Sequence, residues 1–370
     1  MPEFLQASLK VLVGIGLLFG GGELFVQGAV AFALIFGIPQ LVIGLTVVAL
    51  GTSAPELFVS ISSVLQNSDS LAVSNVIGSN IFNVMVVLGS SALVLPLRVE
   101  SRLVRRDVPL MIAVSGAVWG MASGGTVTWQ AGVALLIGLV INTIWEIRTA
   151  REEPSAMEGA EPQISEDAAN GGWPPAALQL LIGVVLLGIG SRVLVSGAST
   201  AAQFLGVSEA IIGLTIVSAG TSMPELITSL VAALKGRTDL AIGNVVGSCL
   251  LNLMMVLAGG AIADAASGLR VSAELINEDL PVMLLTSLAC LPIFWTSGKI
   301  SRREGALLLG LYILYVVDNV LPRTHLSSWT DEFRLTMLCF VLPAVMITIV
   351  TQALIYWRRT RSRKKDLPSA

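Results

Sequence analysis

Eleven long apolar stretches alternate with short polar or charged segments along the 370-residue chain. An α-helix needs about 20 apolar residues to cross the hydrocarbon core of a bilayer, and these stretches have lengths of that order. The pattern therefore predicts an all-α integral membrane protein. Its eleven spans have the approximate limits 8–35, 39–65, 71–95, 106–123, 127–147, 175–204, 208–234, 240–264, 279–296, 304–321 and 335–357.

One segment occurs twice within this pattern. Residues 48–57 read VALGTSAPEL, and residues 217–226 read VSAGTSMPEL, 169 positions later. On the same offset, residues 41–60 match 210–229 at 12 of 20 positions, and residues 71–90 match 240–259 at 10 of 20. Two matches in the same order and register indicate an internal duplication.

The distribution of basic residues predicts the orientation of the chain. With the N-terminus outside, 17 of the 22 lysine and arginine residues fall on the cytoplasmic side, as the positive-inside rule requires. The C-terminus is then cytoplasmic. Equivalent points of the two copies are five spans apart, so the second copy is inverted. The predicted fold is a 5+5 inverted repeat of transmembrane helices plus one extra C-terminal helix, an arrangement typical of secondary transporters.

Composition agrees with a membrane protein, since 54% of residues are hydrophobic and 13% are charged. Lys10, the apolar run after it and the small residues at 29–31 resemble a signal peptide, but this span matches the sixth one, so we expect it to be retained. The expected parts are a first repeat (1–148), an acidic cytoplasmic linker (149–173), a second, inverted repeat (174–322), an outside loop with the extra helix (323–357) and a basic cytoplasmic tail (358–370).

The candidate chemistry lies in the repeated segments. Glu56 and Glu225 are expected near the centre of the bilayer, where an ionisable group costs at least a few kcal/mol unless it is paired or hydrated. A protonated structural glutamate is the alternative, but the duplication argues for a site. Each glutamate follows a proline, which should break the helix and leave carbonyls near residues 49–51 and 218–220 free.

Uncharged oxygen atoms surround each acid in the sequence. Hydroxyl side chains stand four and three residues before each glutamate, at Thr52, Ser53, Thr221 and Ser222. Spans three and eight add a serine and an asparagine four residues apart, at Ser79, Asn83, Ser248 and Asn252. Two carboxylates among hydroxyl, amide and carbonyl oxygens form a hard donor set that suits Ca²⁺ or Na⁺, whereas soft metals prefer sulfur or imidazole.

These motifs resemble the two α-repeats of the cation/calcium exchanger superfamily, in particular those of the prokaryotic sodium/calcium exchangers. The resemblance covers about residues 8–321. It implies antiport of Ca²⁺ against Na⁺ by alternating access in a multi-pass protein of the inner membrane, and no enzymatic activity. The implied Ca²⁺ ligands are Thr52, Glu56, Thr221 and Glu225. The implied Na⁺ ligands are these glutamates, Ser53, Ser79, Ser222, Ser248 and the carbonyls of Ala49 and Ser218, with Asn83 and Asn252 flanking the centre.

Some positions depart from the family pattern. Asn252 stands where several relatives carry aspartate, which argues against potassium dependence, and Cys249 stands opposite Asn80 of the first copy. The eleventh span lies outside the usual ten-helix core. Cys249, Cys290 and Cys339 share no close spacing, so neither a zinc site nor a disulfide framework is expected.

Other functions remain open at this stage. A proton-coupled Ca²⁺ antiporter, or one for another divalent cation, is the nearest alternative, although that branch usually carries Gly-Asn-x-x-Glu. A cation channel or a membrane hydrolase is a less well supported function. A hydrolase would need a catalytic base or metal ligands, and the single histidine, His325, falls in an expected outside loop. No cofactor, no nucleic acid and no obligatory protein partner are predicted, so the partners are Ca²⁺, Na⁺ and membrane lipid.

The offset also aligns Glu23 of the first span with Arg192 of the sixth, so we expect two opposite charges at equivalent depths. If both residues lie close to the symmetry axis, they can form an ion pair. The alternative, in which each faces water or headgroups separately, has equal weight.

Overall fold

The structure is a computed structural model, and it describes the chain in six segments and three isolated positions beyond them. The segments are residues 2–152, 173–204, 218–264, 267–295, 298–323 and 327–341. Residues 2–152 form the first half of the molecule, and the described residues from 173 to 323 form the second half.

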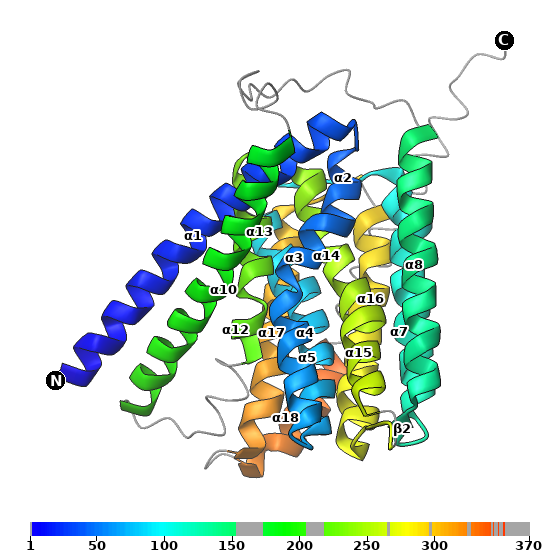
Figure 1. Cartoon of the computed structure of the whole chain (residues 1–370). Helices are drawn as coiled ribbons and strands as arrows, with labels where there is room; N and C mark the ends of the chain where they lie inside the picture. Colours follow the sequence, from blue (N-terminus) through cyan, green and yellow to red (C-terminus); the bar gives the residue numbers. More distant parts are fainter. Residues whose placement is uncertain are drawn as a thin grey trace.

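Helices run in both directions through the molecule and almost all of them lie side by side (Figure 1). The α-helices are α1 (Pro2–Phe36), α2 (Gln40–Ile43), α3 (Ala49–Thr52), α4 (Ala54–Leu65), α5 (Asp69–Phe82), α6 (Leu88–Val94), α7 (Val108–Ala122), α8 (Trp129–Glu152), α10 (Trp173–Phe204), α12 (Ser218–Thr221), α13 (Met223–Leu234), α14 (Thr238–Leu251), α15 (Leu257–Ala263), α16 (Leu280–Trp295), α17 (Arg302–Val320) and α18 (Thr330–Thr336).

Short π-helical and 3₁₀ segments join several of these helices into continuous rods. The π-helical segments are η1 (Gly44–Val48), η2 (Asn83–Val87), η3 (Leu103–Asp107), η5 (Asn252–Val256), η6 (Leu275–Asp279) and η9 (Met337–Val341), and the 3₁₀ segments are η7 (Leu321–Arg323) and η8 (Ser327–Trp329). Two such rods, Asp69–Val94 and Thr238–Ala263, form the centre of the molecule, because 78% and 83% of their most apolar windows are buried.

The predicted helical membrane protein is confirmed. Six helices or rods of the described residues are long and apolar enough to cross a membrane, and the bent pair Gln40–Thr52 and Ala54–Leu65 makes a seventh. Observed limits agree with the expected spans to within a few residues in most cases; the third span, for example, was expected at 71–95. Most of the linker, part of the seventh and eleventh spans, His325 and the basic tail lie outside the described residues.

The longest helices, α1 and α10, pack against each other in antiparallel order at one side of the bundle (Figure 1). Glycines spaced seven residues apart line the contact in both helices, at 14, 21 and 28 and at 183, 190 and 197. A Cβ at Gly14 would lie 2.6 Å from the backbone nitrogen of Leu194, so a larger residue would separate the helices. With 35 and 32 residues, both helices are longer than the roughly 30 Å hydrocarbon core of a bilayer.

Two short strand pairs join the halves at opposite ends of the molecule. β1 (Leu97–Arg98) pairs with β4 (Lys299–Ile300), and β2 (Thr126–Val127) pairs with β3 (Leu269–Arg270), both antiparallel. Each pair takes one strand from each half, and β1 and β3 follow equivalent helices. A two-fold axis that exchanges the halves therefore exchanges the two pairs.

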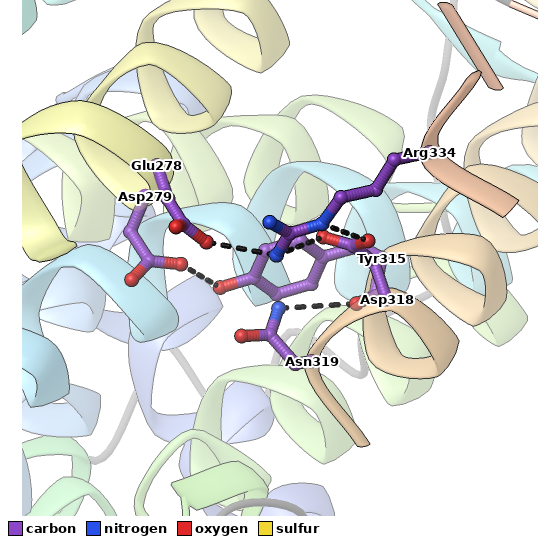
Figure 2. A network of polar contacts seen from close by, with 6 residues as sticks. All are labelled: Glu278, Asp279, Tyr315, Asp318, Asn319 and Arg334. Atoms are coloured by element: carbon purple, nitrogen blue, oxygen red, sulfur yellow. Dashed lines mark hydrogen bonds and ion pairs between the residues drawn. The ribbon is translucent and has the colours of Figure 1, made fainter. Parts of the chain in front are cut away.

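The segment after the second half is attached by an arginine. Arg334 of α18 donates from Nε to Asp318 Oδ1 of α17 at 2.9 Å and from an η nitrogen to Glu278 Oε2 of η6 at 2.9 Å (Figure 2). Beside it, Tyr315 donates to Asp279 Oδ1 at 2.8 Å. In the first half, Glu146 of α8 pairs with Arg102 and Arg106 of the same half. Asp318 and Glu278 of the second half instead pair with an arginine that follows that half.

Candidate cation site

Each copy of the repeated motif breaks its helix just before the acidic residue. α3 ends at Thr52, and the rod that contains it is bent by 44° against α4. Pro55 lies in the first turn of α4, where its missing N–H leaves no helical hydrogen bond unmade. In the second copy α12 ends at Thr221 and α13 begins at Met223. The predicted helix breaks are confirmed.

The break places both acids in the first turn of a new helix. Glu56 in α4 and Glu225 in α13 each have an exposed fraction of 0%. Backbone N–H groups and the partial positive charge at a helix N-terminus stabilise a carboxylate in this position. The local sequence therefore prepares two buried sites for negative charge.

The two acids meet at the interface between the halves. Ser53 Oγ donates to Glu225 Oε1 at 3.0 Å, and Ser222 Oγ donates to Glu56 Oε1 at 3.0 Å. Ser222 also lies 3.0 Å from Ser79 Oγ. Because each serine serves the glutamate of the other half, the site exists only when both halves are assembled.

Two asparagines that the sequence interpretation did not single out hold this arrangement. Asn75 Nδ2 donates to the backbone carbonyl of Glu56 at 3.3 Å and to Ser60 Oγ at 3.0 Å, while its Oδ1 accepts from Thr221 Oγ1 at 3.2 Å. Its counterpart Asn244 repeats all three contacts. It donates to the carbonyl of Glu225 at 3.4 Å and to Ser229 at 2.9 Å, and accepts from Thr52 at 3.1 Å. Identity on the 169-residue offset was the signal that could have revealed them.

The other predicted side chains surround the acids. Ser79 and Asn83 come from the rod of α5 and η2, Ser248 and Asn252 come from the equivalent rod of α14 and η5, and all four are buried. Asn83 and Asn252 each begin a π-helical turn, a feature frequent at functional sites. Thr52 and Ser248 lie beside the Glu225 carboxylate. Of Ser218 only the backbone, the first residue of α12, is described.

Several buried polar atoms of this group have no hydrogen-bond partner within the described protein. They are Glu56 Oε2, Glu225 Oε2, Ser248 Oγ and both side-chain amide atoms of Asn83 and Asn252. No lysine or arginine forms an ion pair with either glutamate among the described residues. The free oxygens come from carboxylates, amides and a hydroxyl, and Ca²⁺ and Na⁺ bind oxygen ligands. The described residues also contain no group of three histidine, cysteine, aspartate or glutamate side chains suited to a metal.

The expectation of free carbonyls before the prolines is only partly right. The Ala49 carbonyl accepts from Ser53 N at 2.9 Å and from Thr52 Oγ1 at 3.3 Å, so it is not left without a hydrogen-bond donor. The Gly220 carbonyl accepts a hydrogen bond from Ser191 Oγ of α10. The equivalent of Ser191 in α1 is Gly22, which has no hydroxyl to offer Gly51. Neighbouring side chains can thus replace the N–H that proline lacks.

Asn80 and Cys249, the equivalent positions that differ in residue type, meet each other. Cys249 Sγ lies 4.0 Å from the carbonyl oxygen of Asn80, and both side chains are buried. Equivalent residues that touch lie on the two-fold axis, so this difference breaks the symmetry at the axis itself. Cys249, Cys290 and Cys339 are free thiols.

A cavity of about 560 Å³ lies on one side of the site, and one of the predicted ligands, Thr221, is among its lining residues. Its walls include Pro55 and Phe58 of α4, Arg192 and Ser196 of α10, and Thr221 of α12. On the equivalent opposite side α1 packs against α13, where a Cβ at Gly22 would lie 2.9 Å from the Ile227 side chain. The two halves are therefore related in sequence but differ in packing around the site.

Of the two alternatives for Glu23 and Arg192, the ion pair does not form. Glu23 Oε1 accepts from Lys235 Nζ of the second half at 2.6 Å, and Arg192 lies 5.8 Å from the Phe58 ring centroid. The order of contacts between α1 and α10 gives the reason, since equivalent positions meet near residues 19–20 and 188–189. Glu23 and Arg192 lie about one turn to either side, which separates them by about 10 Å along the helices. An inverted repeat places equivalent residues at opposite depths, not at the same depth.

Comparison with known proteins agrees with this architecture. The family model for sodium/calcium exchanger proteins matches residues 8–147 and 175–320. A protein from Alkalimonas amylolytica described as a candidate antiporter, CaxA, is 38% identical over 320 residues, which cover 84% of this chain and 98% of the relative. The inner membrane protein YrbG of Escherichia coli is 34% identical over 315 residues, which cover 84% and 96%.

A solved structure shares the fold. The sodium-calcium exchanger NCX_Mj, soaked with 10 mM Na⁺ and zero Ca²⁺, superimposes with a TM-score of 0.72 at 30% identity, covering 85% of this chain and 98% of that one. The fold and the duplicated buried site define a multi-pass membrane transporter built from two related halves. The chain belongs to the sodium/calcium exchanger family.

Proposed function

We propose that the protein is a secondary active antiporter that exchanges Ca²⁺ for Na⁺ across the membrane by alternating access. The observation that carries this proposal is the reciprocal pair of hydrogen bonds from Ser53 to Glu225 and from Ser222 to Glu56. These bonds bring two buried carboxylates to one place with oxygen donors around them. Two carboxylates neutralise one Ca²⁺, or share the charge of several Na⁺ ions.

The proposed ligands follow the two copies of the motif. Ca²⁺ is bound by Thr52, Glu56, Thr221 and Glu225. Na⁺ uses the same glutamates with Ser53, Ser79, Ser222, Ser248 and the carbonyls of Ala49 and Ser218, and Asn83 and Asn252 border the site. The free Oε2 atoms of both glutamates support this assignment, because they leave donor capacity within a buried, oxygen-lined region. Ca²⁺ and Na⁺ are substrates here, and no cofactor or enzymatic step is proposed.

The proposed topology has eleven spans in a 5+5 inverted repeat plus one helix, with the N-terminus outside and the C-terminus in the cytoplasm. It is supported by the antiparallel packing of α1 and α10. It is also supported by the two strand pairs, which a two-fold axis between the halves interchanges. The location in an inner membrane is supported by the name of the relative YrbG. The exposed apolar surface of α8 and α10, including Ile141, Trp145 and Leu181, suits contact with lipid.

Alternating access requires that only one side of the site be open at a time. The cavity beside α10 and the close packing of α1 on α13 at the equivalent opposite position support this mode of action. Related packing arrangements around a central site can exchange roles when the halves are inverted.

The test is uptake of ⁴⁵Ca²⁺ by proteoliposomes that contain the purified full chain. An outward Na⁺ gradient without a pH gradient should drive uptake, and a pH gradient without Na⁺ should not. Uptake driven by protons alone would assign the protein to H⁺/Ca²⁺ antiport. Ca²⁺ flux that needs neither gradient would indicate a channel.

A further inference from the structure

The cavity beside the site carries a fixed positive charge in its wall. Arg192 of α10 lines the cavity, and its guanidinium lies 5.8 Å from the ring centroid of Phe58, which lines the facing wall from α4. A cation and an aromatic ring at this distance attract each other, which directs the charge across the cavity. Among the described residues Arg192 forms no ion pair that would neutralise it.

A second positive charge lies at the rim. Lys10 Nζ of α1 donates to Ser196 Oγ at 3.3 Å, and Ser196 is itself a lining residue. No aspartate or glutamate is among the residues that line the cavity. A cation that reaches the site from this side therefore passes two like charges before it meets the carboxylates.

The opposite side of the site differs in charge, because Glu23 there is paired with Lys235 at 2.6 Å, whereas Arg192 has no ion-pair partner among the described residues. The residue equivalent to Arg192 is Glu23, and the residue equivalent to Val59 of the cavity wall is Thr228, a buried residue whose hydroxyl has no partner in the described protein. A path opened there by related packing would thus contain a hydroxyl and a carboxylate already neutralised by Lys235, and it would lack an unpaired positive charge like that of Arg192. The two access paths therefore differ in charge at one pair of equivalent positions, Glu23 in the first half and Arg192 in the second.

We propose that Arg192, assisted by Lys10, disfavours divalent relative to monovalent cations on the cavity side. This role rests on the proposed exchange of Ca²⁺ for Na⁺. The electrostatic energy of an ion scales with its charge, so a fixed potential reduces the occupancy of Ca²⁺ by the square of the factor for Na⁺. The arginine lowers the occupancy of both ions but favours Na⁺ over Ca²⁺ at this face, which on the proposed topology is the outer one.

The expected size follows from the dimensions of the cavity. A sphere of 560 Å³ is about 10 Å across, and at that distance in water one unit charge changes Na⁺ occupancy about twofold and Ca²⁺ occupancy about fourfold. Salt reduces both factors, because the Debye length is about 10 Å at 0.1 M ionic strength. The difference between the ions is therefore best measured at low and constant ionic strength.

The test uses the full chain in proteoliposomes and measures half-saturating Ca²⁺ and Na⁺ concentrations separately at each membrane face. A membrane-impermeant thiol reagent and a cysteine placed at Ser196 in a Cys339→Ser background identify the molecules whose cavity faces the bath. Arg192→Gln and Arg192→Met remove the charge, Arg192→Lys keeps it, and Lys10→Gln removes the rim charge. Arg303→Gln removes an exposed arginine that does not line the cavity.

Both neutral variants should lower the half-saturating Ca²⁺ concentration at the cavity face about fourfold and that of Na⁺ about twofold. Lys10→Gln should act in the same direction, and Arg192→Lys and Arg303→Gln should resemble the wild type. Equal changes for the two ions, no change, or the same change in Arg192→Lys would overturn the role of Arg192. A wild type without Na⁺-driven Ca²⁺ uptake would refute the proposed function instead.

Discussion

Ser222 Oγ lies 3.0 Å from Glu56 Oε1 although 166 residues separate them, and the same serine lies 3.0 Å from Ser79. The equivalent Ser53 binds Glu225. One hydroxyl thus links the acid of the first half to the motif of the second. Because single side chains couple the two halves, we expect substitutions in either half to affect the whole site.

Neutralising either glutamate should abolish exchange. Glu56→Gln or Glu225→Gln keeps the shape of the side chain and removes one of two charges that compensate Ca²⁺. A loss of about 3 kcal/mol, or about 100-fold in affinity, is expected from unpairing a buried charge. Ca²⁺ uptake measures the loss, and size-exclusion chromatography checks the fold. Glu332→Gln, at an exposed position of α18, serves as the control, and normal exchange in both site variants would contradict the assignment.

The two serines should not be equivalent. Ser222→Ala removes hydrogen bonds to Glu56 and to Ser79, whereas Ser53→Ala removes the bond to Glu225. A hydrogen bond to a charged group contributes about 1.5 to 3 kcal/mol. Both variants should therefore weaken Ca²⁺ binding about 10-fold or more, and Ser222→Ala should weaken it more strongly. Half-saturating Ca²⁺ concentrations measure the order. A larger effect of Ser53→Ala would show that the bond between the serines is unimportant.

Asn75 and Asn244 should act as positioning residues. Asn75→Ala leaves the Glu56 carbonyl, Ser60 and Thr221 without their shared partner, and we expect about 10-fold weaker Ca²⁺ binding from the loss of a buried hydrogen bond. Asn244→Ala should have a similar effect. Asn277→Ala, at an exposed position of η6, is the matched control. If the rate of exchange falls while Ca²⁺ and Na⁺ affinities stay unchanged, the asparagines do not position ligands.

The ion pair of Glu23 and Lys235 should help to hold the closed side. Both side chains are partly exposed, so the pair contributes at most about 1 kcal/mol and its loss should open that side only a few-fold more often. A cysteine at the buried position Thr228, in a Cys339→Ser background, reports opening by its rate of modification. Glu23→Gln and Lys235→Gln should each raise this rate. The exchanged pair, Glu23→Lys with Lys235→Glu, should restore it, and failure to do so would argue against the pair.

Arg334 should anchor the segment beyond the second half. Its hydrogen bonds to Asp318 raise the pKa of the guanidinium above its usual value, so the charge is present at any physiological pH. Arg334→Gln leaves Asp318 and Glu278 without this cation (Figure 2). We expect faster amide hydrogen exchange in residues 327–341, with a loss of about 1 kcal/mol. Unchanged protection would show that apolar contacts alone hold α18.

Sequence patterns predicted much of the site because the chemistry repeats locally. The proline that follows Ala54 and Met223 breaks each helix, and the hydroxyls before it lie near the acids, as expected from spacing within one turn. Asn75 and Asn244 were missed because their role depends on a contact between helices of different halves. A matched asparagine in an apolar helix does not by itself indicate its partner.

Other features depend on how the halves pack. The two-residue strands carry no periodic signal, and the partner of Glu23 follows from where α1 and α10 cross. The cavity is the clearest example, since two nearly equal sequences predict equal surroundings for Glu56 and Glu225. Only the packed structure distinguishes the side next to Arg192 from the side next to Glu23.

The strand pairs limit how such a molecule can move. Leu97 pairs with Ile300 at one end, and Val127 pairs with Leu269 at the other. These two pairs join the halves, so separation of the central rods would require breaking backbone hydrogen bonds. Helices α1 and α10 carry neither strand and touch each other through glycines. In the proposed alternating access, we therefore expect α1 and α10 to move against the rest of the molecule when the open side changes.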